Sequence, residues 1–219
     1  MPDNNAVEIT SIVLARSLQV ITSKAGTSRY LPDLVKDLRA RYSFLTAPKD
    51  DDLFTDPPKG AELKHGKLVF KDETVVIDKL VIFNDGIAVD TTSSTDNSDR
   101  FLDDLLEWAK DGLPKAQIGV RYYLSHVEMR MSKPLGDYVH HFRSIGENIT
   151  ALLKSYGIMV PQYEPTALNL HFDQLGKVSP IPGVFYIDRR QGRPFSDNLW
   201  FSQAPLRTGD HVALLRHLG

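Results

Sequence analysis

Residues 74–92 read TVVIDKLVIFNDGIAVDTT, and this stretch decides the fold class of the chain. Two apolar, β-branched segments, 74–83 and 87–92, flank the sequence Asn84-Asp85-Gly86. A turn of this composition between apolar segments is the strongest short-range signal for a β-hairpin, because Asp and Gly tolerate positive φ. We therefore expect two antiparallel strands joined at this turn.

The segments around the hairpin extend it into a mixed α and β pattern. Strands are predicted at residues 6–22 and 62–70, and the spacing of apolar residues predicts an amphipathic helix over 31–43. After the hairpin, a helix capped by Ser98 and stopped by Gly112 is expected. Four carboxylates near its start are expected to complement the helix dipole: Asp96, Asp99, Asp103 and Asp104.

The second half of the chain repeats this order of elements. A strand at 122–131 is followed by a long amphipathic helix at about 133–156, strands at 168–172, 184–187 and 199–201, and a helix capped by Thr208. The predicted fold class is α+β, mainly antiparallel sheet or sheets with helices packed on one face. Two similar β-α-β-β-β-α halves are one hypothesis, and a single mixed sheet is the alternative. The predicted domains are an acidic half, 1–112, and a basic half, 113–219.

The long helix of the second half carries a continuous apolar seam. Seven residues step along it by three and four: Leu135, Tyr138, Phe142, Ile145, Ile149, Leu152 and Tyr156. A stripe of this spacing lies on one side of a helix and here extends over about three heptads.

Charge is distributed unevenly between the halves. Residues 1–112 contain 14 Lys and Arg against 20 Asp and Glu, and residues 113–219 contain 12 against 8, in agreement with the net charge of −2. Attraction between two parts of one body explains this pattern, and so does a basic end that binds an acidic partner or another copy.

Composition and motifs exclude several classes of protein. The chain has no cysteine, so disulfides, zinc–thiolate sites and iron–sulfur clusters are excluded. Nucleotide-binding, nucleophile-elbow and His-Glu-x-x-His motifs are absent from the sequence. The modest acidity argues against general nucleic-acid binding. A cytoplasmic location is expected, because the sequence contains neither a long apolar run nor a basic start followed by an apolar stretch.

One candidate metal site comes from two predicted strands. His126 and Glu128 lie two residues apart on one strand, and His171 and Asp173 lie two apart on another. If these strands are neighbours, their side chains could bind Zn, Mn or Fe. The same alternation is typical of a half-buried sheet whose polar face meets water.

A basic cluster follows the apolar segment 184–187 and is predicted to form a hairpin tip. It contains Arg189, Arg190 and Arg193, and the nearby aromatic residues Tyr186, Phe195 and Trp200 are of the kind found with Arg at protein interfaces. The tip is a candidate site for phosphate, carboxylate or an acidic protein surface. A solvated turn is the alternative.

Three functions are consistent with these features. The favoured hypothesis is a non-enzymatic interaction or assembly module that needs no cofactor, self-associates or binds a protein partner through the basic tip, and does not bind membranes. The first alternative is a metal-dependent hydrolase or nuclease that uses the His, Asp and Glu residues above. The second is a small-ligand sensor with its pocket between the halves.

Overall fold

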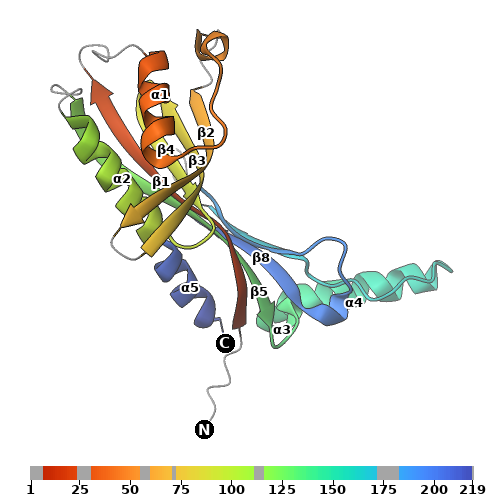
Figure 1. The fold of residues 1–219 in the computed structure, drawn as a ribbon. Helices are drawn as coiled ribbons and strands as arrows, with labels where there is room; N and C mark the ends of the chain where they lie inside the picture. The colour runs from red at the N-terminus through yellow and green to blue at the C-terminus, as the bar shows by residue number, and fades with distance from the viewer. Residues whose placement is uncertain are drawn as a thin grey trace. The chain divides into compact units, whose positions relative to one another are not determined.

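The computed structural model describes residues 7–23, 31–54, 60–70, 73–110, 116–171 and 183–218 (Figure 1). The elements of the first half are β1 (Val7–Ser23), α1 (Leu31–Tyr42), the 3-10 helix η1 (Asp50–Phe54), β2 (Ala61–Phe70), β3 (Glu73–Phe83), β4 (Gly86–Thr91) and α2 (Thr95–Ala109). Those of the second half are β5 (Ala116–Met131), α3 (Leu135–Tyr138), α4 (His140–Ser155), β6 (Ala167–Leu170), β7 (Phe185–Arg189), the 3-10 helix η3 (Phe195–Asp197), β8 (Leu199–Ala204) and α5 (Thr208–Arg216).

The predicted α+β class is confirmed, with eight antiparallel strands and five α-helices in the described residues. The chain forms two compact units. Unit 1 contains Met1–Ser11, His126–Ala204 and Asp210–Gly219, and unit 2 contains Ile12–Ser125 and Pro205–Gly209. The boundary between the units therefore does not coincide with the predicted division at residue 112, because β1 and β5 each contribute residues to both units.

Unit 2 is a sheet in the order β2-β3-β4-β1-β5 with α1 and α2 packed against it. Its core brings Leu38 and Tyr42 of α1 and Phe101 of α2 together with Leu80 and Val89 of the hairpin strands. The rings of Tyr42 and Phe101 lie 4.5 Å apart, so the two helices share one apolar layer.

The predicted hairpin joins β3 to β4, with Phe83 paired to Gly86 across the turn. The turn was predicted because Asp and Gly tolerate positive φ, but Gly86 does not adopt a positive φ. A Cβ atom at this position would lie 2.8 Å from the carbonyl oxygen of Gln19. The glycine is therefore required by the close approach of β1 rather than by the conformation of the turn.

On its polar side, the sheet of unit 2 carries paired charges. Arg16 of β1 binds Asp90 of β4 through two hydrogen bonds of 2.6 and 2.8 Å. Lys79 of β3 lies 3.8 Å from Asp90 and 3.7 Å from Glu62 of β2. Cross-strand pairs of opposite charge stabilise neighbouring strands, so these residues satisfy one another along the sheet.

Unit 1 contains the strand order β1-β5-β8-β7-β6 together with α3, α4 and α5. Its core contains Val127 and Met129 of β5, Ile187 of β7, Trp200 of β8 and Leu215 of α5. These strand residues alternate with more exposed ones, which is the pattern of a sheet with one buried face.

Several boundaries differ from the predicted ones, and three of these differences are the largest. Helix α2 begins at Thr95 and is capped by Ser94, whose Oγ accepts a hydrogen bond of 3.3 Å from the backbone of Asn97. Ser98 is instead buried and donates to the carbonyl oxygen of Ala15 at 2.7 Å. The helix predicted at 133–156 is divided into α3 and α4 at Val139, whose φ of −125° leaves the helical region. Finally, β5 begins at Ala116, before the strand start predicted at residue 122.

Duplication of the two halves stays a hypothesis. In each half the last three strands form a meander, β2-β3-β4 in the first and β6-β7-β8 in the second, and a helix follows. Among the described residues, no helix is long and apolar enough to cross a membrane.

Candidate interaction surface

The basic tip lies in the connection between β7 and β8. The Arg189 guanidinium carbon lies 3.3 Å from the ring centre of Phe195, and the same side chain donates to the carbonyl oxygen of Arg193. The Arg190 Nε atom lies 2.8 Å from a carboxylate oxygen of Glu128. The ion pair of Arg190 reduces the net charge that the tip offers to a partner, whereas the contacts of Arg189 hold its side chain in place without neutralising it.

The aromatic residues near the tip lie in different environments. Tyr186 packs against Phe201 at 5.9 Å between ring centres, and Phe195 is half exposed beneath Arg189. Trp200 is only 3% exposed, because the alternation of β8 turns it into the core of unit 1. Trp200 is therefore a packing residue rather than a surface one, and an interaction role for the other five residues stays a prediction.

The residues of the candidate metal site do not lie on neighbouring strands. His126 and Glu128 lie on β5 and His171 follows β6, but β8 and β7 separate these strands. Three strand spacings amount to about 14 Å, too far for ligands of one ion. Glu128 binds Arg190 and accepts a hydrogen bond from Ser11. Asp173 lies outside the described residues, among which no group of three or more His, Asp or Glu side chains could hold a metal ion.

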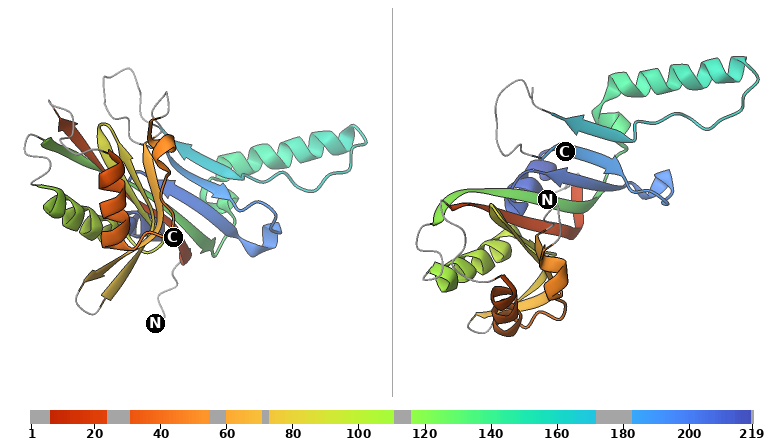
Figure 2. Two further views of the ribbon diagram at one scale, coloured as in Figure 1. Left: turned by 45° about the horizontal axis from the view of Figure 1, so that its top comes forward. Right: turned by 90° about the horizontal axis from the view of Figure 1, so that it is seen from above.

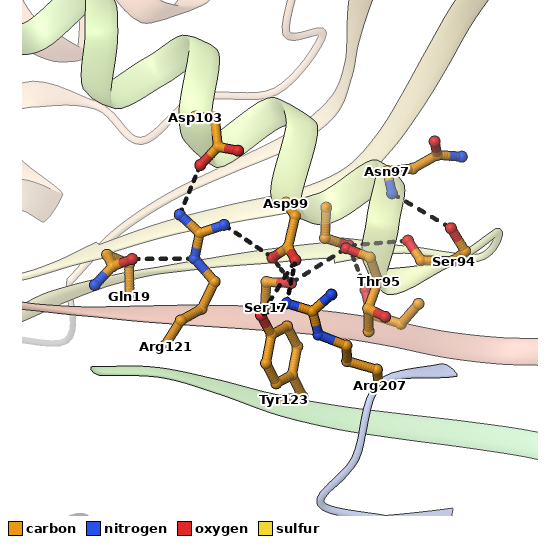
Figure 3. A network of polar contacts seen from close by, with 12 residues as sticks. Ser17, Gln19, Ser94, Thr95, Asn97, Asp99, Asp103, Arg121, Tyr123 and Arg207 are labelled. Atoms are coloured by element: carbon orange, nitrogen blue, oxygen red, sulfur yellow. Dashed lines mark hydrogen bonds and ion pairs between the residues drawn. The ribbon is translucent and has the colours of Figure 1, made fainter. Parts of the chain in front are cut away.

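A charged network joins α2 to β1 and β5 in unit 2 (Figure 3). Asp99 accepts hydrogen bonds from Ser17 at 2.8 Å and from Tyr123 at 3.2 Å, and one of its oxygens lies 3.1 Å from Arg121. Arg121 also binds Asp103 at 2.7 Å. Burial and the charge of Asp99 raise the pKa of the Tyr123 hydroxyl. Because these groups are paired with one another, the network fixes α2 to the strands and does not resemble an open ligand site.

The start of α5 takes part in this network. Arg207 donates a hydrogen bond of 2.8 Å to the Tyr123 hydroxyl. The backbone amide of Thr95 donates to the Thr208 side chain at 3.2 Å, and the amide of Thr208 donates to the Thr95 side chain at 3.0 Å. These reciprocal bonds attach the segment Pro205–Gly209 to the start of α2. The sequence showed the carboxylates of α2, but their partners come from distant segments that no local pattern identifies.

Helix α4 is held in unit 1 through one narrow side. A Cβ atom at Gly146 would lie 2.3 Å from the carbonyl oxygen of Tyr163, so the following segment crosses α4 at this glycine. The Thr150 hydroxyl accepts a hydrogen bond of 2.9 Å from the Tyr163 amide. Gly146 and Thr150 are the buried residues of α4. In both views of Figure 2, α4 extends beyond β6 and β7, with the chain returning alongside it.

A second side of α4 is apolar and exposed. Five large side chains of the predicted seam form this surface, which we call the α4 face: Phe142, 64% exposed; Ile145, 53%; Ile149, 38%; Leu152, 54%; and Tyr156, the residue that ends the helix, 68%. At 100° per residue they fall within an arc of about 80°. The seam spacing predicted from the sequence is therefore present, but the part of the seam on α4 faces solvent.

Charged side chains of α4 lie away from this face. Arg143 binds Asp137 and lies 3.5 Å from Glu147, on the side of the helix next to Gly146. The other border of the α4 face carries no Asp, Glu, Lys or Arg and consists of His141, Asn148 and Ser155. The α4 face is therefore an apolar stripe with a neutral edge.

Comparisons with protein families and with curated proteins found no match for this chain.

Proposed function

We propose that this chain is a non-enzymatic protein-interaction module whose contact surface is the α4 face. The observation that carries the proposal is the exposure of five large apolar side chains on one side of a single helix. Such helices usually bury this side against a groove or another helix. The proposal keeps the assembly hypothesis drawn from the sequence and moves its main surface from the basic tip to α4.

The size of the α4 face supports this role. Aromatic side chains contribute about 150–250 Å² each when fully exposed, so the five partly exposed side chains present about 500 Å². A contiguous apolar patch of roughly 300–600 Å² is the largest that a typical soluble monomer shows, and such patches are often binding surfaces.

The charge of α4 favours a protein partner over a lipid surface. Helices that lie on membranes are rich in Lys and Arg on the polar side. Helix α4 contains two such residues, Arg143 and Lys154, together with one acidic residue, Glu147. This composition fits an apolar contact with another protein segment.

The basic tip stays a second predicted contact site in unit 1. Arg193 and Phe195 are exposed there, and Arg189 is stacked in a fixed position on Phe195. A small-ligand site between the halves also stays a prediction. The strand order does not favour the metal-dependent alternative, because the strands that carry His126 and His171 are not neighbours.

Photo-crosslinking in cells tests the proposal. A benzophenone amino acid at Tyr156 of the full chain is expected to give a discrete protein adduct, because this position lies on the α4 face. The same group at Val76, which is 58% exposed on β3, is the matched control. Equal labelling at both positions, or an adduct to lipid at Tyr156, would rule out a protein-binding α4 face.

A further inference from the structure

We infer that the occupant of the α4 face is the α4 face of a second copy of this chain, bound in antiparallel orientation about a two-fold axis near Ile149. This inference rests on the proposed function and names its partner. It follows from the order of side chains along the helix, from their area and from the distribution of charge.

The order of aromatic and aliphatic side chains along the α4 face is the same in both directions. Ile149 lies at its centre, the aliphatic residues Ile145 and Leu152 flank it, and the aromatic residues Phe142 and Tyr156 close it. In a two-fold interface the same patch is used on both subunits, so it must be complementary to itself. Antiparallel pairing about Ile149 places an aromatic ring opposite an aromatic ring and an aliphatic side chain opposite an aliphatic one.

The area of the α4 face is sufficient for a specific dimer. Two copies of the α4 face bury about 1,000 Å² in total, which is roughly the lower limit for a specific protein interface. A dimer of modest affinity that depends on concentration is therefore expected.

The charges of α4 permit self-association. A residue on a two-fold axis meets its own copy, so a charge at the centre of the face would repel itself. The residues next to the proposed axis are Ile149, at the centre of the α4 face, and Asn148, at the same height on its border. Both are uncharged. The cations Arg143 and Lys154 lie on the side of the helix away from the face, and Arg143 is paired with Asp137. A partner of opposite charge would instead require charged side chains along the border of the face.

Antiparallel orientation follows from the attachment of α4. The helix is about 24 Å long at 1.5 Å per residue and leads away from the strands of unit 1 (Figure 2). A parallel pair would bring the strands of both copies to the same end of the helices. An antiparallel pair places them at opposite ends, and it also opposes the two helix dipoles favourably.

Sedimentation over a concentration series tests self-association of the full chain. The wild-type chain is expected to shift from monomer toward dimer as its concentration rises, and Ile149→Glu is expected to weaken the dimer at least tenfold. Ala151→Glu is the matched control, because it adds the same charge to an exposed position of α4 outside the face. Equal weakening by both variants, or a wild-type chain that stays monomeric at every concentration, would overturn the inference.

Cysteine variants test the orientation, because the chain has no cysteine of its own. With a short bis-maleimide, Asn148→Cys is expected to cross-link to itself. His141→Cys and Ser155→Cys are expected to cross-link when mixed, since residues near opposite ends of the helix meet in an antiparallel pair. Efficient linking of His141→Cys to itself, without linking in the mixture, would show a parallel pair and overturn the inference.

The adducts formed at Tyr156 separate this inference from the proposed function. An adduct of twice the chain mass supports both. An adduct to a different protein leaves the proposed function intact and overturns the second copy as occupant. Labelling no stronger than at Val76 overturns both.

Discussion

Arg121 is the residue on which the network of unit 2 depends most. It pairs with Asp99 and Asp103 and donates a hydrogen bond to Gln19 at 3.0 Å, and its side chain is only 19% exposed. Arg121→Ala would leave the half-buried Asp99 carboxylate with fewer partners. We expect the free energy of unfolding to fall by about 2 kcal/mol, between the values typical of exposed and buried pairs.

Urea denaturation measures this change, with Arg100→Ala as the control. Arg100 and Glu73 also form an ion pair, at 2.8 Å, but both side chains are more than half exposed. Exposed pairs contribute less than about 1 kcal/mol, so the control is expected to stay close to the wild type. Equal effects of the two substitutions would contradict a special role for Arg121.

His211 is expected to make stability depend on pH. It is fully buried in unit 1, where burial and the nearby His126 lower its pKa to about 4. Ser202 donates to the carbonyl oxygen of Tyr186, so its hydroxyl accepts from the Nε2–H of neutral His211 at 2.9 Å. Between pH 6.5 and 4 the unfolded chain binds a proton that the folded chain does not, so acidification destabilises the fold.

The size of this effect can be measured by denaturation at pH 7 and pH 5. His211 is expected to contribute a loss of about 2 kcal/mol over this range. His211→Gln should reduce the dependence on pH, and His217→Gln, which changes an exposed histidine near the end of the same helix, should retain it. An unchanged dependence in His211→Gln would show that other groups cause it.

At the scale of the element, α4 depends on Gly146. Alanine is a better helix former than glycine, by about 1 kcal/mol in an exposed helix. In α4, however, the added Cβ would meet the carbonyl oxygen of Tyr163. We therefore expect Gly146→Ala to displace the returning segment and to speed hydrogen exchange at the Tyr163 amide about tenfold. Ser144→Ala, at an exposed position of the same helix, should leave this amide protected.

The elements themselves could be predicted from local patterns. Periodicity gave the order of strands and helices, and the Asn84-Asp85-Gly86 turn gave the hairpin. The start of α2 was misplaced because Ser94 and Ser98 are both chemically suited to a cap, and only tertiary contacts bury Ser98. The break at Val139 was missed because apolar spacing continues across it, although β-branched residues are weaker helix formers.

The candidate site was predictable only in part. The spacing of Phe142, Ile145 and Ile149 predicted an apolar stripe, but spacing does not reveal what covers a stripe. The metal hypothesis depended on the order of strands, which is decided by packing between distant segments and which no local pattern reveals. Packing between distant segments also decides whether the polar face of a predicted strand contacts water or another element.

At the scale of the whole molecule, some of the opposite charges of the two sequence halves pair with one another within unit 2. Arg121 and Arg207 come from the basic half of the sequence, and both lie next to Asp99 of the acidic half (Figure 3). These contacts support the hypothesis that the uneven charge distribution stabilises the chain itself over the hypothesis that the basic half binds an acidic partner. The two halves of the sequence thus contribute residues to one charged network, and the predicted division at residue 112 stays a prediction.

Division of the chain at residue 112 is accordingly expected to disrupt both units. The fragment 1–112 lacks β5, which supplies Arg121 and Tyr123 to unit 2, and the fragment 113–219 lacks β1, which supplies Val7 to the core of unit 1. Each fragment alone should unfold without a cooperative thermal transition. The fragment 1–131 restores β5 and is the matched control, for which we expect a cooperative transition. A cooperative transition in 1–112 as sharp as that of 1–131 would show that β5 is dispensable, and the sequence halves would then be independent domains after all.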